Sequence, residues 1–235
     1  DRLGDALVSY ARYLAATFWP TDLSITYWHP SSWPVATLVG CAVLLGAITI
    51  ASLRALKSRP FLAVGWLWFL GMLVPVIGVV QVGEQAMADR YMYLPSIGLF
   101  IALAWGVDSA VPEFRGRTRV LALVAAAVLI VCAWLTHAQT RVWQNSNALW
   151  RHAHEVDPHN PLALEVLGVL AEEQSRQVEA LGYYRRALEI DPQRQNSQYN
   201  LGNLLRWFGR PDEALGPLLE AVRLRPDFAM AYESL

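Results

Sequence analysis

Charged residues are scarce in this chain of 235 residues, since only 17% are Asp, Glu, Lys or Arg and the formal net charge is −1. A surface that binds nucleic acid needs a clear basic excess, so we expect no nucleic-acid partner. Cysteine is also scarce, and both copies, Cys41 and Cys132, lie within apolar stretches, which argues against a disulfide. The sequence lacks a glycine-rich phosphate loop, a Cys-x-x-Cys pair and a Gly-x-Ser-x-Gly motif, so no soluble catalytic centre is indicated.

Apolar residues, by contrast, make up 54% of the chain, and its mean hydropathy is +0.27. This composition is too apolar for an ordinary soluble domain of the same length. Four stretches nearly free of charge approach the roughly 20 residues that a helix needs to cross a bilayer. They lie at 35–53, 61–80, 91–107 and 120–136, inside a membrane domain predicted at 34–139. We therefore expect an all-α fold that contains a multi-span transmembrane helix bundle, with buried helices of a soluble core as the alternative.

Basic residues are unevenly distributed over the loops between these stretches. Loops 54–60 and 108–119 each hold three of them, whereas loop 81–90 holds one arginine and two carboxylates. The positive-inside rule places the two basic loops on the cytoplasmic side. Residues 1–33, loop 81–90 and everything after the fourth stretch are then extracytoplasmic.

The N-terminal segment, 1–33, is predicted to lie at the membrane surface. Apolar side chains recur at helical spacing, at Leu3, Leu7, Tyr10, Leu14 and Phe18. This pattern predicts an amphipathic helix lying at the interface, with a helix of an upstream domain's core as the alternative. The external loop that follows contains Tyr27, Trp28 and Trp33, which suit the headgroup region.

The last third of the chain repeats one pattern at a constant spacing. Leu167-Gly168, Ala180, Tyr184, Ala187 and Pro192 correspond to Leu201-Gly202, Ala214, Leu218, Ala221 and Pro226. This spacing is typical of tetratricopeptide (TPR) repeats, which are pairs of antiparallel helices stacked into a solenoid. We expect a TPR region at 140–235, made of a degenerate repeat (140–160), two repeats (161–194 and 195–228) and a partial one (229–235). Its groove predicts a protein or peptide partner, unless these repeats only extend a longer solenoid.

Segment 81–95 is a polar insertion in an apolar region. Its charged residues Glu84, Asp89 and Arg90 lie at the predicted external mouth of two membrane stretches, where a charge is costly unless it is paired or binds a ligand. Arg90, with Tyr91 and Tyr93 beside it, is suited to bidentate binding of a lipid phosphate. We take these three charged residues as a candidate substrate-binding site. The alternative is a structural ion pair of Arg90 with Asp89 or Glu84.

Two segments carry a resemblance to a known family. They are Ala88-Asp89-Arg90 followed by Tyr93-Leu94-Pro95-Ser96, and the run from Thr140 to Trp150 that leads into the first repeat. Together with the apolar run before them, they resemble the C-terminal membrane portion of bacterial TPR membrane proteins similar to the TMTC group, the transmembrane and TPR-containing O-mannosyltransferases. One departure is Asp89, where the TMTC pattern has glutamate.

The resemblance implies a glycosyltransferase of the GT-C type, which transfers a sugar from a polyprenyl-phosphate carrier to a protein hydroxyl on the outer face of a membrane. It also implies a bacterial inner membrane, and a position for Arg90 and Asp89 near the lipid donor. In that class an acidic residue of the first external loop acts as base or holds a divalent metal. We expect this loop, and any such metal, in an N-terminal part outside the present sequence, so no catalytic residue is assigned.

No cofactor site is predicted within the present sequence. His152 and His154 are two positions apart on a predicted helix and face different sides, which argues against a metal pair. The sequence starts without an initiator Met, and residues 231–235 match the opening of a further repeat, so we expect an interior piece of a longer protein. A membrane-anchored TPR scaffold that assembles envelope or secretion machinery without catalysis is the competing functional hypothesis.

Overall fold

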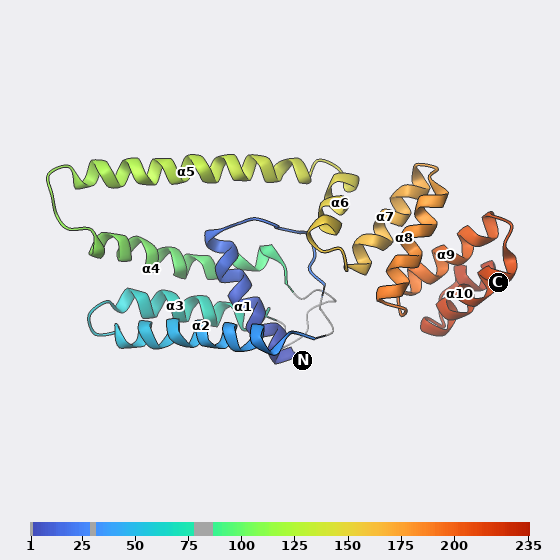
Figure 1. Cartoon of the computed structure of the whole chain (residues 1–235), viewed down its shortest axis with the longest axis horizontal. Helices are drawn as coiled ribbons and strands as arrows, with labels where there is room; N and C mark the ends of the chain where they lie inside the picture. Colours follow the sequence, from blue (N-terminus) through green and yellow to red (C-terminus); the bar gives the residue numbers. More distant parts are fainter. Residues whose placement is uncertain (1, 29–31, 78–86) are drawn as a thin grey trace. The chain divides into compact units, whose positions relative to one another are not determined.

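The computed structural model describes residues 2–28, 32–77 and 87–235, and the regular structure in these ranges is helical (Figure 1). The one β-type pairing between described residues is an isolated antiparallel bridge of Tyr27 with Met87. The predicted all-α fold is therefore confirmed. The chain divides into two compact units, Asp1–Thr140 and Arg141–Leu235.

The described part of the first unit consists of helices and one short turn. They are α1 (Arg2–Phe18), α2 (Val35–Arg54), α3 (Pro60–Leu73), the 3-10 turn η1 (Asp89–Met92), α4 (Pro95–Ala110) and α5 (Arg117–Val142). Helices α3 and α4 each begin with a proline, whose missing N–H is not needed in a first helical turn. No residue of α5 is buried, so the described part of the chain leaves its apolar surface uncovered.

Two of the four predicted membrane stretches form helices long and apolar enough to cross a bilayer, namely α2 and α5. The predicted helix over 61–80 is too long, because Pro75 has no N–H to donate to Gly71 and α3 ends at Leu73. Its residues 78–80 lie outside the described ranges. The helix predicted over 91–107 starts too early, because a 3-10 turn precedes α4. The multi-span bundle is thus not confirmed beyond these two candidate spans.

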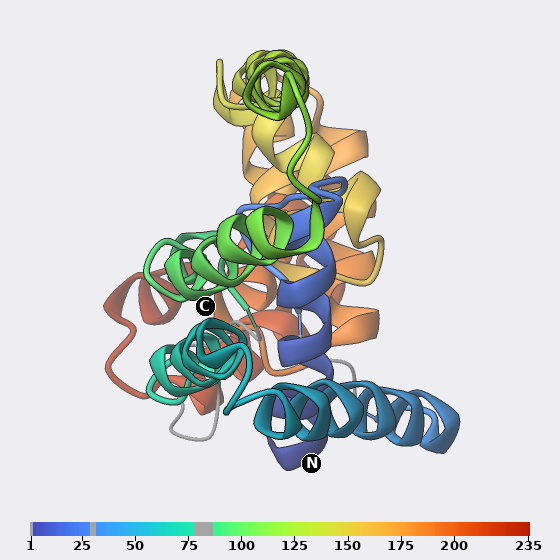
Figure 2. The ribbon, with the colours of Figure 1, turned by 90° about the vertical axis from the view of Figure 1, so that its left-hand side faces the viewer.

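Helices α3 and α4 lie side by side (Figures 1 and 2) and approach most closely at two glycines. A methyl group added at Gly65 would overlap the carbonyl oxygen of Gly98, and one added at Gly98 would overlap that of Gly65. Small residues permit this backbone contact, which is common between helices in membranes. The glycine pair therefore fixes how α3 packs on α4.

Helix α1 crosses α2 and α3 obliquely (Figure 1), and its packed face includes only part of its predicted apolar stripe. Its buried residues are Gly4, Ala6, Val8, Ser9 and Tyr13. Of the predicted stripe, Leu3 and Phe18 are 72% and 58% exposed. The Tyr10 hydroxyl donates a hydrogen bond of 2.8 Å to the carbonyl of Leu70, which attaches α1 to α3. Within the predicted stripe, Tyr10 thus packs on α3, whereas Leu3 and Phe18 stay exposed.

The second unit is a stack of helical pairs. Its elements are α6 (Ser146–Val156), α7 (Pro161–Glu173), α8 (Gln177–Ile190), α9 (Gln195–Trp207), α10 (Pro211–Leu224) and α11 (Ala229–Ser234). Helix α7 packs on α8, and α9 packs on α10. A Cβ added at Gly168 would lie 2.5 Å from Cε1 of Tyr184, and one at Gly202 would lie 2.6 Å from Cγ of Leu218. The glycine of each repeat therefore makes room for the large side chain of its partner helix.

Successive repeats are joined by a buried polar cluster. Glu165 on α7 accepts hydrogen bonds from Arg194 (2.9 Å) and from the Ser197 hydroxyl on α9 (2.7 Å). The turns inside the two repeats are also equivalent, because Ser175 (φ 57°) and Gly209 (φ 70°) adopt the left-handed conformation at corresponding positions of the repeat. The sequence period is thus reproduced in helix packing and in turn geometry.

Candidate functional site

The segment at Met87–Ala88, just before the predicted charged pair, is held against α1. Both residues are buried, and so is Tyr13 of α1, which is 1% exposed. The Tyr13 hydroxyl accepts a hydrogen bond from the N–H of Ala88 (2.9 Å) and donates one to the carbonyl of the same residue (3.1 Å). One side chain thus satisfies both backbone groups of Ala88 and fixes the position of the residues that follow.

Asp89 turns toward the loop after α1. The Tyr27 hydroxyl donates to Asp89 Oδ1 at 3.0 Å, and the N–H of Ser24 donates to the Tyr27 oxygen at 2.9 Å. The Arg12 guanidinium carbon lies 5.2 Å from the centre of the Tyr27 ring. Asp89 is therefore the half-buried centre of a small network built by three residues of the N-terminal segment.

The pKa values of these groups follow from their burial. Burial raises the pKa of Asp89, against the opposing effects of the Tyr27 hydroxyl, the Ser24 N–H and the Arg12 charge. Burial likewise raises the pKa of Tyr27, and the nearby Asp89 charge raises it further. Burial raises the pKa of Tyr13 to about 12. Both tyrosines consequently stay protonated at neutral pH and can donate their hydroxyl hydrogens.

Arg90 differs from its neighbour because its side chain is exposed. Its guanidinium carbon lies 5.2 Å from the centre of the Tyr91 ring, and within the described part of the chain it forms no ion pair with a carboxylate. The alternative of an Asp89–Arg90 ion pair is therefore wrong. Glu84, the third predicted residue, lies outside the described residues. The structure thus places Asp89 and Arg90 next to each other in different roles, and substrate binding by them stays a prediction.

Sequence reasoning missed the residues that hold this segment. The partners of Tyr13 and Tyr27 are 75 and 62 positions away in the sequence, and no local pattern indicates such distant pairs. The assignment of Tyr27 to an aromatic belt is wrong, since its side chain is 5% exposed. The available signal was the surplus of tyrosine among residues 10–27, which offers hydroxyl donors in an apolar surrounding.

An apolar groove of about 730 Å³ lies between α1, α2, α3 and α4. Its walls include Phe18, Ile48, Trp66 and Leu103, and Ser52 is the one hydroxyl residue among its lining residues. Such a surface can hold hydrocarbon and offers little to a polar ligand.

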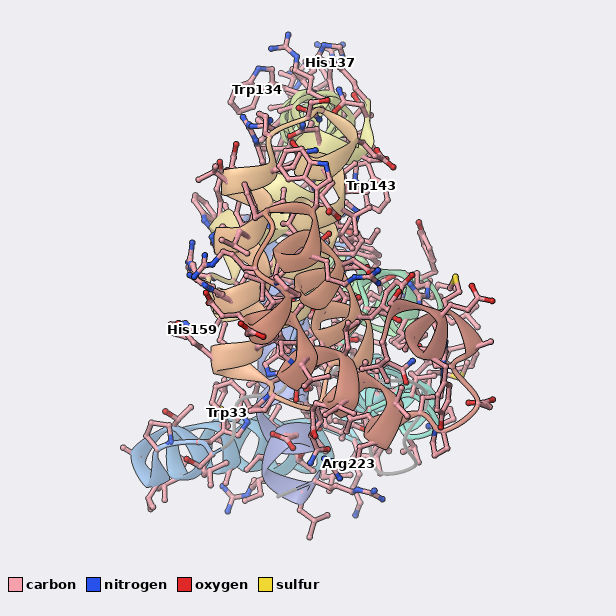
Figure 3. All side chains as sticks on the ribbon, turned by 90° about the vertical axis from the view of Figure 1, so that its right-hand side faces the viewer. Trp33, Trp134, His137, Trp143, His159 and Arg223 are labelled. Carbon is pink, nitrogen blue, oxygen red and sulfur yellow. The ribbon has the colours of Figure 1, made fainter. Side chains whose placement is uncertain are left out.

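Possible ligands of a metal ion do not gather in the described ranges, where no three His, Cys, Asp or Glu side chains converge. At the end of α5, Trp134, His137 and Trp143 point away from the ribbon (Figure 3), and the two tryptophans are 68% and 56% exposed. Exposed tryptophans of this kind suit a membrane surface better than water.

The sequence of this chain is similar to those of several known proteins. No family model matches the chain. Protein O-mannosyl-transferase TMTC1 of Mus musculus is 26% identical over 162 residues, which are 68% of this chain and 17% of that protein. The human protein of the same name is 26% identical over 194 residues, 76% of this chain and 22% of that protein. The curated relatives of this chain are TMTC proteins.

Other TMTC proteins match more briefly, such as Tmtc2 of Drosophila melanogaster, which is 33% identical over 94 residues, 40% of this chain and 10% of that protein. The resemblance to the TMTC group is thereby confirmed. The chain spans about a fifth of the length of the TMTC1 relatives that it matches.

Solved structures similar to the chain include a Thermobaculum terrenum O-GlcNAc transferase mutant, which is 31% identical in sequence. The match covers 46% of this chain and 22% of that chain, and its TM-score is 0.36. They also include YrrB, described as a TPR protein with an unusual peptide-binding site, with 18% identity, 85% and 87% of the two chains covered, and a TM-score of 0.35.

Proposed function

We propose that this chain is the membrane and repeat portion of a GT-C-like glycosyltransferase that moves a sugar from a polyprenyl-phosphate carrier to a protein hydroxyl. The observation that supports it is the extent of the TMTC similarity. The alignments with TMTC1 cover 68% and 76% of this chain. Neither Asp1–Thr140 nor Arg141–Leu235 is long enough to contain such an alignment by itself. The similarity therefore includes both units and does not come from generic repeats alone.

The proposal places the first unit in a membrane, such as a bacterial inner membrane, with the repeat unit on the outer side. Helices α2 and α5 are long enough to cross it. The 14 residues of α3 are only about 21 Å long, which is less than the thickness of about 30 Å of the bilayer's hydrocarbon core. The three basic residues after α2 and the three before α5 favour a cytoplasmic location for those loops. The exposed Trp134 and Trp143 suit the opposite surface.

A reporter active only outside the cytoplasm tests this orientation. Fused after residue 160, it should give signal, and fused after Lys57 it should give none. Signal from the second fusion alone would reverse the proposed topology.

In the proposed reaction Arg90 binds the phosphate of the carrier, because its guanidinium is exposed and its donors are not used by a carboxylate of the described residues. Asp89, and Glu84 outside the described ranges, would border the same site. The apolar groove between α1 and α4 would hold part of the carrier's hydrocarbon chain. The repeats would hold the acceptor or another protein partner in their groove.

A transfer assay tests the proposal. Membranes that contain the full-length protein would receive a radiolabelled polyprenyl-phosphate mannose, and label on protein hydroxyls would be measured. We expect Arg90→Ala to abolish transfer while the protein still inserts into the membrane. Arg59→Ala, in the loop between α2 and α3, should leave transfer unchanged. Failure of the wild-type protein to transfer any label would favour the non-catalytic scaffold.

A further inference from the structure

We propose that Arg12 of α1 and Arg90 form a two-guanidinium site for the phosphate ester of a membrane lipid. The inference rests on the proposed function, because it adds a second positioning residue to the site assigned to Arg90. Both side chains are exposed, and neither forms an ion pair with a carboxylate of the described residues.

Both arginines are held by aromatic rings. Arg12 lies over Tyr27 and Arg90 over Tyr91, each with its guanidinium carbon 5.2 Å from the ring centre. A ring face orients a guanidinium through its π-electrons and leaves the N–H donors free. A planar fork with free donors is the group that binds phosphate oxygens in a bidentate way.

The two arginines belong to one network. Arg12 packs on the ring whose hydroxyl donates to Asp89, and Arg90 is the next residue in the chain. The Asp89 carboxylate accepts a hydrogen bond from that hydroxyl, and the carboxylate of Asp22, whose carbonyl lies 3.3 Å from the Tyr27 oxygen, is exposed and forms no ion pair with Arg12. The Arg12 charge acts on the Asp89 carboxylate, and Arg90 follows Asp89 directly in the chain, so two positive charges lie on a segment that contains one half-buried carboxylate. This excess of positive charge favours an anion.

The surroundings favour a lipid over a free phosphate. Phe18 and Trp19, which follow Arg12 by six and seven positions at the end of α1, are 58% and 74% exposed. Tyr93 and Leu94, which follow Arg90 by three and four positions, are 79% and 55% exposed. Exposed aromatic and apolar residues in the same segments as arginine are typical of a membrane surface, where lipid phosphates lie.

Native mass spectrometry of the full-length protein in detergent tests the site. The probes are a polyprenyl phosphate, phosphatidylglycerol and inorganic phosphate. We expect Arg12→Gln and Arg90→Gln each to lower affinity for the polyprenyl phosphate about tenfold, the loss of one charge-assisted interaction, and Arg59→Gln to have no effect. If Arg12→Gln does not fold, Arg12→Lys keeps the charge without the fork and should lower affinity less.

Each outcome decides the inference. Unchanged affinity in the Arg12 variant overturns it, and if Arg90→Gln still loses sugar transfer, the proposed function survives without it. Equal competition by inorganic phosphate also overturns it, because the site would then not select lipids. Equal binding of phosphatidylglycerol supports a lipid-phosphate site but removes the support for a dedicated sugar carrier.

Discussion

Tyr13 satisfies the two backbone groups of Ala88, a residue 75 positions away, and it does so from a buried position. Removing its hydroxyl would leave a buried N–H without a partner. We expect Tyr13→Phe to lower the free energy of unfolding by about 1–3 kcal/mol. Thermal unfolding in detergent would measure this, with Tyr93→Phe as the matched control, since Tyr93 is 79% exposed. Equal melting of the two variants would contradict the role of the hydroxyl.

The raised pKa of Asp89 predicts a pH dependence of stability. Burial raises this pKa above the value of 3.8 for a free side chain, so the folded protein binds the proton more tightly than the unfolded chain. The stability that the carboxyl contributes is then largest below the unfolded pKa, and it is lost as the pH rises through the folded one.

Asp89→Asn should abolish this loss. The midpoint of unfolding of the wild-type protein should fall relative to that of the variant as the pH rises from about 4. Parallel curves for the two proteins over this range would show that the carboxyl titrates alike in both states.

At this scale the sequence singles out Asp89 and Arg90 as charges in an apolar region but does not predict their environments. They are singled out because charges in an apolar region are costly, and a role of theirs in substrate binding stays a prediction. Their different environments could not be found, because Tyr27, 62 positions from Asp89, decides which of the two is turned inward.

At the scale of elements, glycines determine how helices pair. The ring of Tyr184 occupies the space that a side chain at Gly168 would need, whereas no atom lies within 4 Å of a Cβ added at Gly182. We expect Gly168→Ala to destabilise the protein by about 1–3 kcal/mol through overpacking. Gly182→Ala, in the interior of α8, should stabilise it by about 0.5–1 kcal/mol. Chemical denaturation would compare the two, and a shift in the same direction for both would contradict this packing.

The repeat pattern is predictable because each of its positions has a local geometric reason, such as the contact of Gly202 with Leu218. The ends of the apolar helices are less predictable from hydropathy. Pro75 sets where α3 ends and Pro95 sets where α4 begins. Apolar residues nevertheless lie on both sides of each proline. Backbone hydrogen bonding therefore overrides hydropathy at these boundaries.

At the scale of the whole molecule, the two units have separate cores. A main cluster of the second unit is formed by Ala171, Ala180, Tyr184, Leu201, Leu204, Leu205, Ala214 and Leu218. We therefore expect residues 141–235, produced alone, to keep a helical circular-dichroism spectrum and to unfold cooperatively. The same fragment with Gly168→Ala should unfold at lower temperature. A spectrum without helix would show that the repeats need the first unit in order to fold.

The glycine contact between α3 and α4 has a mechanical consequence. With backbone against backbone at Gly65 and Gly98, neither helix can turn about its own axis without collision, so the pair behaves as one stiff body. Displacement of Arg90 must then be absorbed outside this body, in the few residues between Met92 and Pro95 or at the Tyr13 hydroxyl. A ligand bound at Arg90 would therefore also act on α1, because Tyr13 of that helix holds Ala88, two residues before the arginine.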